Sequence, residues 1–456
     1  MAKAARKLPP HPKDYPVLGS VPSFIRDTPQ TFVDGWKERG DVVRFRGIRP
    51  MVLVSHPDSV KHVLEDNNAN YRRSDTVTEA LSMLLGESSF TAQGEAWRQR
   101  ARLVHPLLRP DRIPRLSERV ASAAAAMSER LSRAADGGQT LDLYDEALTM
   151  SVDAAARILF GEERGGDFDR LREVSVTANE YVIAKTMAVG GPPDVRIRPA
   201  YRRYLAAVAG LEETIGRVTA ERRRQPAEDL VSRLVGARGD DGQALSDSEV
   251  RDEAVTFLQT AHAGVASAVM WVLALLAQHP DARSRVLSEL DTAIGDRPAT
   301  TEGTRDLRYL TAVVDETLRL YPSLWVFALV PIADDVIGGY DVPAGMSVVI
   351  SPYITHRHPE FWEDPEQFAP ERFLDPPADG RHPYAYFPFS GGPRRCPASD
   401  LALAMVRVAV ATVVPRHRIE LVPGHAIERR REFVLRPSNG LPVKIAAAER
   451  QPAGAV

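Results

Sequence analysis

The chain has 456 residues, of which 58 are Lys or Arg, 61 are Asp or Glu and one is Cys. A formal net charge of −3 gives no reason to expect a nucleic acid as partner. The single cysteine excludes an internal disulfide framework, a multi-cysteine zinc site and a cysteine-ligated iron–sulfur cluster.

The N-terminal 24 residues are rich in proline and predict an extended arm over a folded body. They contain no apolar run long enough for the core of a signal peptide. We also find no stretch of about 18 apolar residues elsewhere in the chain. We therefore expect a cytoplasmic protein without a membrane anchor.

The next elements follow from hydrophobic patterning. Two short strands joined by a turn are expected within residues 41–54, followed by a helix over 58–67 and a loop-rich segment to about residue 94. From about residue 95 to 285 the pattern is mostly helical. Glycine-containing breaks interrupt this helical region at 137–138, 165–166, 190–193 and 239–242.

A capping box of Ser246 and Glu249 predicts the start of a long helix that ends before Pro280. A further helix is expected over 306–320, and an apolar helix over 399–413. Between them, and again near the C-terminus, strand and turn signals dominate. We find no internal repeat and no low-complexity linker. The prediction is therefore one domain over residues 1–456, mainly α with a minor β portion (α+β).

The loop before the last predicted helix contains the only cysteine, Cys396, within the sequence FPFSGGPRRCPA. Its two glycines allow the backbone to approach a flat group, since glycine has no Cβ. The following helix N-terminus and two arginines favour the thiolate over the thiol. On these residues alone, a buried structural cysteine and a reactive thiolate both stay open.

This loop resembles the haem-binding loop of the cytochrome P-450 superfamily, Phe-x-x-Gly-x-Arg-x-Cys-x-Gly/Ala. The matching residues are Phe389, Gly392, Arg394, Cys396 and Ala398. The resemblance implies a haem b whose iron takes Cys396 as its axial thiolate, with Arg394 on a haem propionate and Phe389 beside the sulfur. Thiolate ligation pushes electron density toward the iron and favours O–O cleavage.

Two further segments resemble the same family. Glu316 and Arg319 match its Glu-x-x-Arg pair, and residues i and i+3 share one face of a helix. Taken alone, such a pair is usually a solvated contact. Arg372, in a Pro-Glu-Arg-Phe run, is implied to complete a buried structural triad with them. The resemblance covers essentially the whole chain and implies a haem between the long distal helix and the cysteine loop.

The long helix departs from the family pattern over residues 257–271, FLQTAHAGVASAVMW. Most members carry an acid followed by an alcohol here. An ungapped alignment puts Ala263 at the acid and Gly264 at the alcohol. A second register, shifted by three residues, makes Ser267 the alcohol. In either register the acid is missing.

Proton delivery to dioxygen usually depends on that pair. A substrate hydroxyl, a carboxyl or an ordered water can replace it in a monooxygenase. Alternatively, peroxide supplies the oxygen, or the enzyme catalyses a rearrangement, dehydration or coupling. A haem protein without oxidative catalysis is a further alternative. His262 is a candidate replacement acid, because an ordinary histidine titrates near neutrality.

The expected clamp on the haem propionates is also altered. The family's Trp-x-x-x-Arg helix begins here at Trp97, but Ala101 stands in the arginine's place. Trp97 can still donate its indole N–H to a propionate. Arg100 and His105 are further candidate partners. Since residues 323–333 contain no base, Arg394 is the main expected partner.

The resemblance places the substrate pocket along residues 84–90, the middle of the long helix and the segment after residue 324. The candidate pocket residues are Ala261, His262, Ala263, Gly264, Ser267, Trp325, Val326 and Phe327. Such residues belong equally well to an ordinary core. If they line a cavity, they favour a terpenoid, a fatty acyl chain or a polyketide.

The expected function is that of a monooxygenase of secondary metabolism acting on a small hydrophobic molecule. We expect a monomer that receives electrons from a separate ferredoxin or flavodoxin and its reductase, as the resemblance implies.

Overall fold

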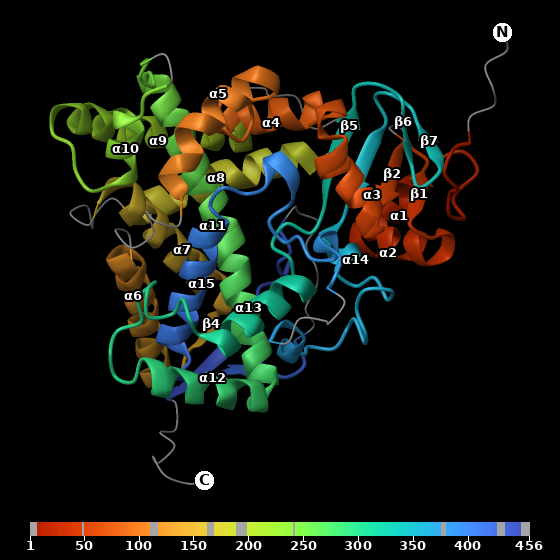
Figure 1. Ribbon diagram of the computed structural model, residues 1–456. Coiled ribbons are helices and arrows are strands. Elements are labelled where there is room, and N and C mark those ends of the chain that lie inside the picture. Colours follow the sequence, from red (N-terminus) through yellow and green to blue (C-terminus); the bar gives the residue numbers. More distant parts are fainter. Residues whose placement is uncertain are drawn as a thin grey trace.

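The computed structural model describes most of the chain, apart from short gaps between its elements. The described residues are 7–47, 50–109, 117–161, 168–187, 198–239, 242–374, 380–425 and 434–447. Within them, helices form the larger part of the molecule and most strands gather at one side (Figure 1). This agrees with the predicted α+β class. The predicted breaks at 165–166 and 190–193 lie outside the described residues, as does the start of the arm.

The larger sheet has five strands in the order β1-β2-β8-β5-β3. Strands β1 and β2 are antiparallel neighbours, whereas β2 and β8 run parallel. Strand β5 pairs antiparallel with both β8 and β3. Their bounds are β1 Val42–Phe45, β2 Met51–Val54, β3 Tyr71–Arg72, β5 Phe327–Pro331 and β8 Ser347–Ile350.

Two smaller sheets complete the β portion. One is a hairpin of β6 and β7, and the other has the order β4-β10-β9. Their bounds are β4 Thr140–Asp142, β6 Asp335–Ile337, β7 Tyr340–Val342, β9 His417–Leu421 and β10 Pro442–Ala447. The predicted strand signal near the C-terminus is confirmed for β10, while residues 426–433 lie outside the described part.

The helices before the long central one cover the upper and left parts of the view in Figure 1 and flank the sheet. A π-helical turn, His62–Asp66, extends α3, so that the helix predicted over 58–67 is confirmed. The bounds are α1 Val21–Arg26, α2 Thr28–Arg39, α3 Pro57–Lys61, α4 Asp75–Leu85, α5 Gly94–Val104, α6 Ser117–Asp136, α7 Leu143–Phe160, α8 Phe168–Met187, α9 Pro199–Arg224 and α10 Leu230–Gly236.

The remaining helices run from the centre of the molecule to its lower part (Figure 1). The helix after the cysteine has the predicted bounds, and short 3₁₀ turns lie at Asn68–Asn70, His105–Leu108, Pro370–Phe373, Pro383–Ala385 and Gly392–Arg394. The helix bounds are α11 Asp247–Gln278, α12 Pro280–Ala293, α13 Arg308–Leu320, α14 Pro352–Thr355 and α15 Ser399–Val413.

The long helix α11 begins at the predicted capping box. Ser246 Oγ accepts from the backbone N–H of Glu249, whose carboxylate accepts from the N–H of Ser246. By length and composition α11 alone is long and apolar enough to cross a membrane among the described helices. However, 78% of its most apolar window is buried inside the protein, so it is a core helix.

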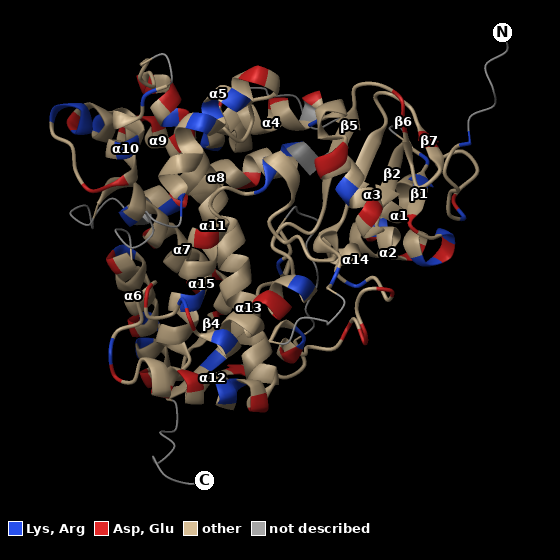
Figure 2. Ribbon diagram, viewed as in Figure 1, with Lys and Arg blue, Asp and Glu red and all other residues tan. Residues whose placement is uncertain are grey.

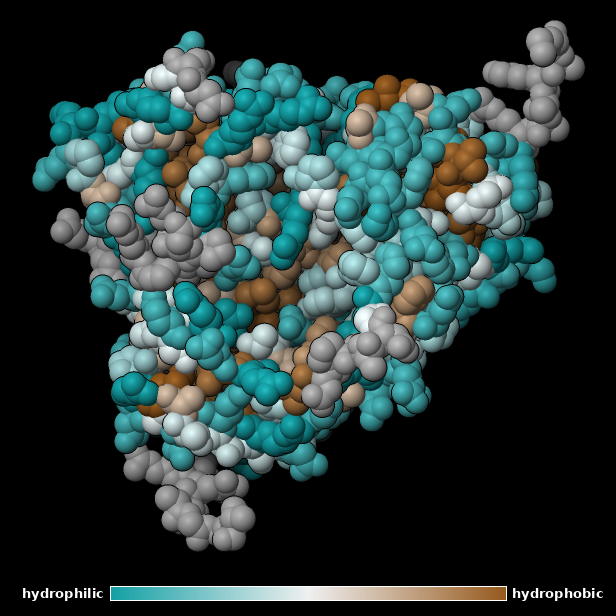
Figure 3. Space-filling view, in the orientation of Figure 1, coloured by the Kyte–Doolittle hydropathy of each residue, from teal (hydrophilic) through white to brown (hydrophobic). Residues whose placement is uncertain are grey.

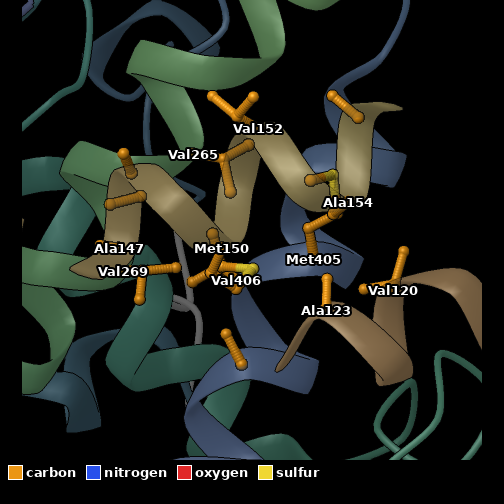
Figure 4. Packing of buried hydrophobic residues seen from close by; sticks show 14 of the residues in the cluster. Val120, Ala123, Ala147, Met150, Val152, Ala154, Val265, Val269, Met405 and Val406 are labelled. Carbon is orange, nitrogen blue, oxygen red and sulfur yellow. The ribbon is translucent and has the colours of Figure 1, made fainter. Parts of the chain in front are cut away.

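Helix α11 is fixed in the core by α7 and α15, and α6 packs against both of these helices. Figure 4 shows Met150 of α7, Val265 of α11 and Met405 of α15 among the packed side chains. All three are at most 4% exposed. Burying a side chain of this size contributes about 1.5–3 kcal/mol. This packing therefore fixes one face of α11 in the core, and so determines which residues lie on the opposite face of the helix.

Two local predictions are corrected by the structure. The segment predicted to be loop-rich contains α4, which begins because Ser74 Oγ accepts from the N–H of Val77. The last residues of the predicted arm enter α1, since Pro22 occupies the first helical turn, where no N–H is needed.

Charged residues of both signs are interspersed over the periphery, as Figure 2 shows. In the space-filling view, hydrophobic residues are visible in a hollow near the middle of the same face, between hydrophilic regions (Figure 3).

Candidate functional site

The loop that carries Cys396 is fixed by backbone contacts. The N–H of Cys396 donates to the carbonyl of Phe389 at 3.0 Å, which folds the loop back on itself. Gly392 has φ +62°, and a Cβ there would lie 1.9 Å from the carbonyl oxygen of Leu64 in the π-helical turn. Only glycine allows this approach. The cysteine is thus held between that turn and the start of α15.

Cys396 presents a single, half-buried thiol and is not in a disulfide. Burial raises its pKa, whereas the N–H of Ala398 and the charge of Arg395 lower it. Among the described residues no three His, Cys, Asp or Glu side chains gather as a metal cluster. A lone sulfur donor beside a glycine-lined loop fits a metal ion whose other ligands come from a flat macrocycle.

One half-buried arginine lies within this loop and another approaches it, and both donate to backbone carbonyls. Arg394 donates to Ala92 at 3.0 Å, and its guanidinium lies 4.0 Å over the ring of Trp97. Arg73 donates to the carbonyl of Phe90 and lies 4.3 Å over that ring. Within the described part of the chain, neither guanidinium forms an ion pair with a carboxylate.

The pKa values of both arginines are lowered, as expected for buried cations without a neighbouring carboxylate. Burial, followed by the charges of Arg73 and Arg98, lowers the pKa of Arg394 to about 10. Burial lowers the pKa of Arg73 to about 10 as well. Two such cations favour a dianionic ligand, because burying an unpaired charge is costly. The two carboxylates of a haem fit this requirement.

The other predicted propionate partners have different surroundings. Trp97 is half-buried, and its ring centroid lies 6.5 Å from that of His105. Burial, and then the charge of Arg394, lowers the pKa of His105, so it is neutral at neutral pH. Both belong to the same cluster as Arg394.

The prediction for Arg100 is wrong. Its guanidinium lies 2.8 Å from Glu249 and 3.7 Å from Glu253, both on α11. No local sequence signal reveals that these acids of α11 pair with Arg100. Conversely, sequence analysis missed Arg73. Only the pairing of β3 with β5 brings this residue to the site.

One face of α11 is uncovered in the middle of the helix. Thr260 is exposed, and Ala261, Ala263 and Gly264 are half-buried, although the residues on either side are buried. A Cβ on Gly264 would have only Ser323 Cβ, at 4.0 Å, within contact distance. The sequence-predicted distal residues Ala261, Ala263 and Gly264 therefore border open space.

Ser267 is placed differently. It is fully buried, and its hydroxyl donates to the carbonyl of Leu435 at 2.8 Å. The indole of Trp271 donates to the same oxygen at 2.9 Å. This hydroxyl holds the loop at residue 435 to the helix. The open position belongs to Gly264.

His262 does not face the open space. It is 3% exposed, and its Nδ1 lies 3.2 Å from the carbonyl oxygen of Gln259. Burial lowers its pKa to about 4. Because the ring is buried and neutral at neutral pH, the structure contradicts its role as a replacement acid.

The predicted pocket wall after residue 324 is also corrected. Trp325 is 1% exposed, and its ring packs edge-on against Phe32 at 6.3 Å. Val326 lies in the same hydrophobic cluster. Both residues belong to the core between α2 and the large sheet. Phe327, on β5, is half-buried and stays a candidate.

The predicted triad is formed. Glu316 and Arg319 are fully buried, and their two hydrogen bonds measure 2.7 and 2.8 Å. Arg372 Nε donates to the same carboxylate at 3.1 Å. Arg319 also donates to the carbonyl of His356, whose Nε2 accepts from the N–H of Phe387 at 2.9 Å. The triad is thereby connected to the start of the cysteine loop.

Comparisons with known proteins agree with this geometry. The sequence model of the family described as Cytochrome P450 matches residues 9–445. The chain is 34% identical to cyclooctat-9-en-7-ol 5-monooxygenase of Streptomyces melanosporofaciens, over 91% of this chain and 90% of the relative. It is 28% identical to cytochrome P450 4c3 of Drosophila melanogaster, over 96% of this chain and 88% of the relative.

Solved structures show the same fold. The heme domain of cytochrome P450DA superposes with a TM-score of 0.88 at 21% identity, covering 98% of this chain and 99% of that one. Retinoic acid-bound cyanobacterial CYP120A1 gives a TM-score of 0.83 at 24% identity, covering 97% of this chain and 100% of that one.

Proposed function

This chain belongs to the cytochrome P450 family, and from that premise we propose that it inserts one oxygen atom into a small hydrophobic alcohol. The family identifies it as a haem-thiolate monooxygenase acting on hydrophobic substrates. The substrate's own hydroxyl would take the place of the alcohol that α11 lacks. When bound, the haem supplies the activation of dioxygen.

The residues around the cysteine loop are assigned to the haem. Cys396 would supply the thiolate ligand, with Phe389 and Ala398 beside the sulfur, and Gly392 lets the loop lie close to its neighbours. Arg394, Arg73 and Trp97 would hold the haem carboxylates, with His105 beside them. The support is the pair of cations that lack a carboxylate partner within the described residues. The triad of Glu316, Arg319 and Arg372 keeps the loop in place.

The observation that carries the substrate proposal is the open surface at Gly264. This position offers no side chain, and the nearby hydroxyl of Ser323 is already donated to the carbonyl of Gly264 at 2.8 Å. Ser267 is committed to Leu435, and His262 is buried and neutral. A hydroxyl delivered by the substrate meets the need for a proton donor and acceptor there.

The relative from Streptomyces melanosporofaciens supports this class of substrate. Its name gives cyclooctat-9-en-7-ol as the substrate, which is an unsaturated alcohol. The mostly apolar residues that border the open face, Ala261, Ala263 and Gly264, suit a hydrophobic skeleton that carries one polar group.

Members of this family generally use redox partners. For this chain we propose a separate ferredoxin or flavodoxin with its reductase, and a monomeric, single-domain protein of the cytoplasm. In the part of the chain that the structure describes, one helix has the length and composition to cross a membrane, and it is the buried α11.

The test compares matched substrates. The holo-protein is incubated with hydrophobic alcohols and with the same skeletons lacking the hydroxyl, with surrogate redox partners and NADPH. We expect product from the alcohols and uncoupled NADPH consumption with the deoxy compounds. Equal coupling on both would contradict the proposal. Product only with hydrogen peroxide would instead indicate a peroxide-using enzyme.

The iron ligand is tested independently of turnover. The ferrous carbon monoxide spectrum should show the red-shifted Soret band of a thiolate-ligated haem, and Cys396→Ser should lose it. Retention of that band in the serine variant would exclude Cys396 as the ligand.

A further inference from the structure

The loop of residues 86–92, between α4 and α5, is held to α11 by two carboxylates. The N–H of Glu87 donates to Asp252 at 2.8 Å. The N–H and the hydroxyl of Ser89 donate to the two oxygens of Glu253 at 2.6 and 2.7 Å. The loop therefore presents its donors to α11.

Two carbonyl groups of the same loop accept hydrogen bonds from positively charged side chains. Phe90 and Ala92 accept from Arg73 and Arg394, the two cations assigned to the haem carboxylates. Within the loop, the hydroxyl of Thr91 donates to the carbonyl of Gly86 at 2.6 Å. This internal bond ties the start of the loop to its end.

Glu253 is a buried carboxylate and not part of a surface ion pair. It is 3% exposed, and the groups that face it are Ser89 from the loop, Arg100 of α5 at 3.7 Å and the neighbouring Asp252. Burial raises its pKa to about 7, against the hydrogen bonds from Ser89 and the charge of Arg100. A carboxylate kept in such surroundings is held by its donors, which are those of the loop.

We propose that Glu253, assisted by Asp252, is a positioning residue that fixes loop 86–92 so that its carbonyls direct Arg73 and Arg394 toward the haem carboxylates. This inference rests on the proposed haem site. It assigns to α11 a second role: its middle borders the open distal space, while its N-terminal half sets the propionate clamp through the loop.

The test measures haem retention rather than turnover. Holo-protein is mixed with excess apomyoglobin, and haem transfer is followed by absorbance. Glu253→Gln should lose haem on the order of tenfold faster than the wild type, since a charge-assisted hydrogen bond is replaced by a mismatched amide. Ser89→Ala keeps the N–H donor and should show a smaller change in the same direction.

The pH profile separates positioning from a general loss of stability. Between about pH 8 and pH 6, protonation of Glu253 weakens its hold on Ser89, and wild-type haem loss should accelerate, whereas Glu253→Gln should be flat. Burial lowers the pKa of His105, so this ring titrates at a lower pH than an ordinary histidine. The control is Glu289→Gln, because Glu289 also accepts from two backbone N–H groups, but at the start of α13. It should keep both the wild-type rate and profile.

The outcomes distinguish this inference from the proposed function. If Arg394→Ala accelerates haem loss and Glu253→Gln matches the wild type at every pH, the positioning role is overturned and the haem site stands. If the wild type itself holds no thiolate-ligated haem, the proposed function fails first.

Discussion

Replacing Glu316 by Gln removes the one negative charge of a buried cluster. The carboxylate of Glu316 accepts from both Arg319 and Arg372, and also from the N–H of Ala369 at 2.9 Å. The amide keeps the shape of the side chain but offers one acceptor oxygen. The guanidinium groups of the fully buried Arg319 and the half-buried Arg372 then remain without a counter-charge.

The expected cost follows from that geometry. Breaking a buried ion pair by removing one partner costs about 3–5 kcal/mol, because the remaining charge is left desolvated. Here one carboxylate serves two cations, so we expect a loss of about 4 kcal/mol. With a urea dependence of about 3 kcal/mol per molar, the unfolding midpoint should fall by about 1.3 M.

Urea unfolding of matched holo-proteins, followed by tryptophan fluorescence, measures this shift. The control is Glu371→Gln, because Glu371 pairs with Arg285 in the neighbouring segment but both side chains are more than half exposed, at 54% and 51%. An exposed pair contributes below about 1 kcal/mol. A Glu316→Gln midpoint no lower than that of the control would refute the reasoning.

Three further predictions follow from the site. Gly392→Ala should abolish the thiolate spectrum with carbon monoxide, since its Cβ would meet the Leu64 carbonyl at 1.9 Å, whereas Gly424→Ala, with a similarly positive φ of +76° and open space, should keep it. Burial lowers the pKa of His262 to about 4, so the fold keeps this ring neutral while the unfolded chain protonates it below about pH 6.5. The contribution of the neutral ring to the free energy of unfolding is fully present above pH 6.5 and is lost as the pH falls toward 4. At about pH 5 the free energy of unfolding should be lower by about 2 kcal/mol. His262→Gln removes the titrating ring, so its free energy of unfolding, measured with urea, should depend less steeply on pH. Gly264→Thr should improve coupling of NADPH to product on deoxy substrates, because the nearest neighbour of its new Cβ is Ser323 Cβ at 4.0 Å; unchanged coupling with an intact haem spectrum would count against the substrate-hydroxyl proposal.

Local chemistry made the capping box and the Glu316–Arg319 pair predictable, whereas the roles of the cysteine loop and of Arg372 came from the family resemblance. Ser246 and Glu249 satisfy each other's backbone donors, and this needs only a spacing of three residues. Glu316 and Arg319 likewise meet within one helical turn. In these cases the contact lies inside the element that the sequence pattern predicts.

Long-range packing decided the parts that were missed or wrong. Arg73 reaches the site because Tyr71 pairs with Pro331, a partner far along the chain. Arg100 turns to α11 because the carboxylates of Glu249 and Glu253 lie within ion-pair distance there. Trp325 packs in the core against Phe32. Because an apolar side chain suits a core and a pocket wall equally well, the sequence alone could not distinguish these two places.

Because Cys396 is the only thiol in the sequence, its reactivity can be used to follow loss of the haem. A maleimide dye has one position to modify in all 456 residues, and by the assignment above it is the position that a bound haem covers. Labelling under native conditions is therefore confined to molecules whose cofactor has left, and it is measured without reference to any absorbance coefficient of the haem.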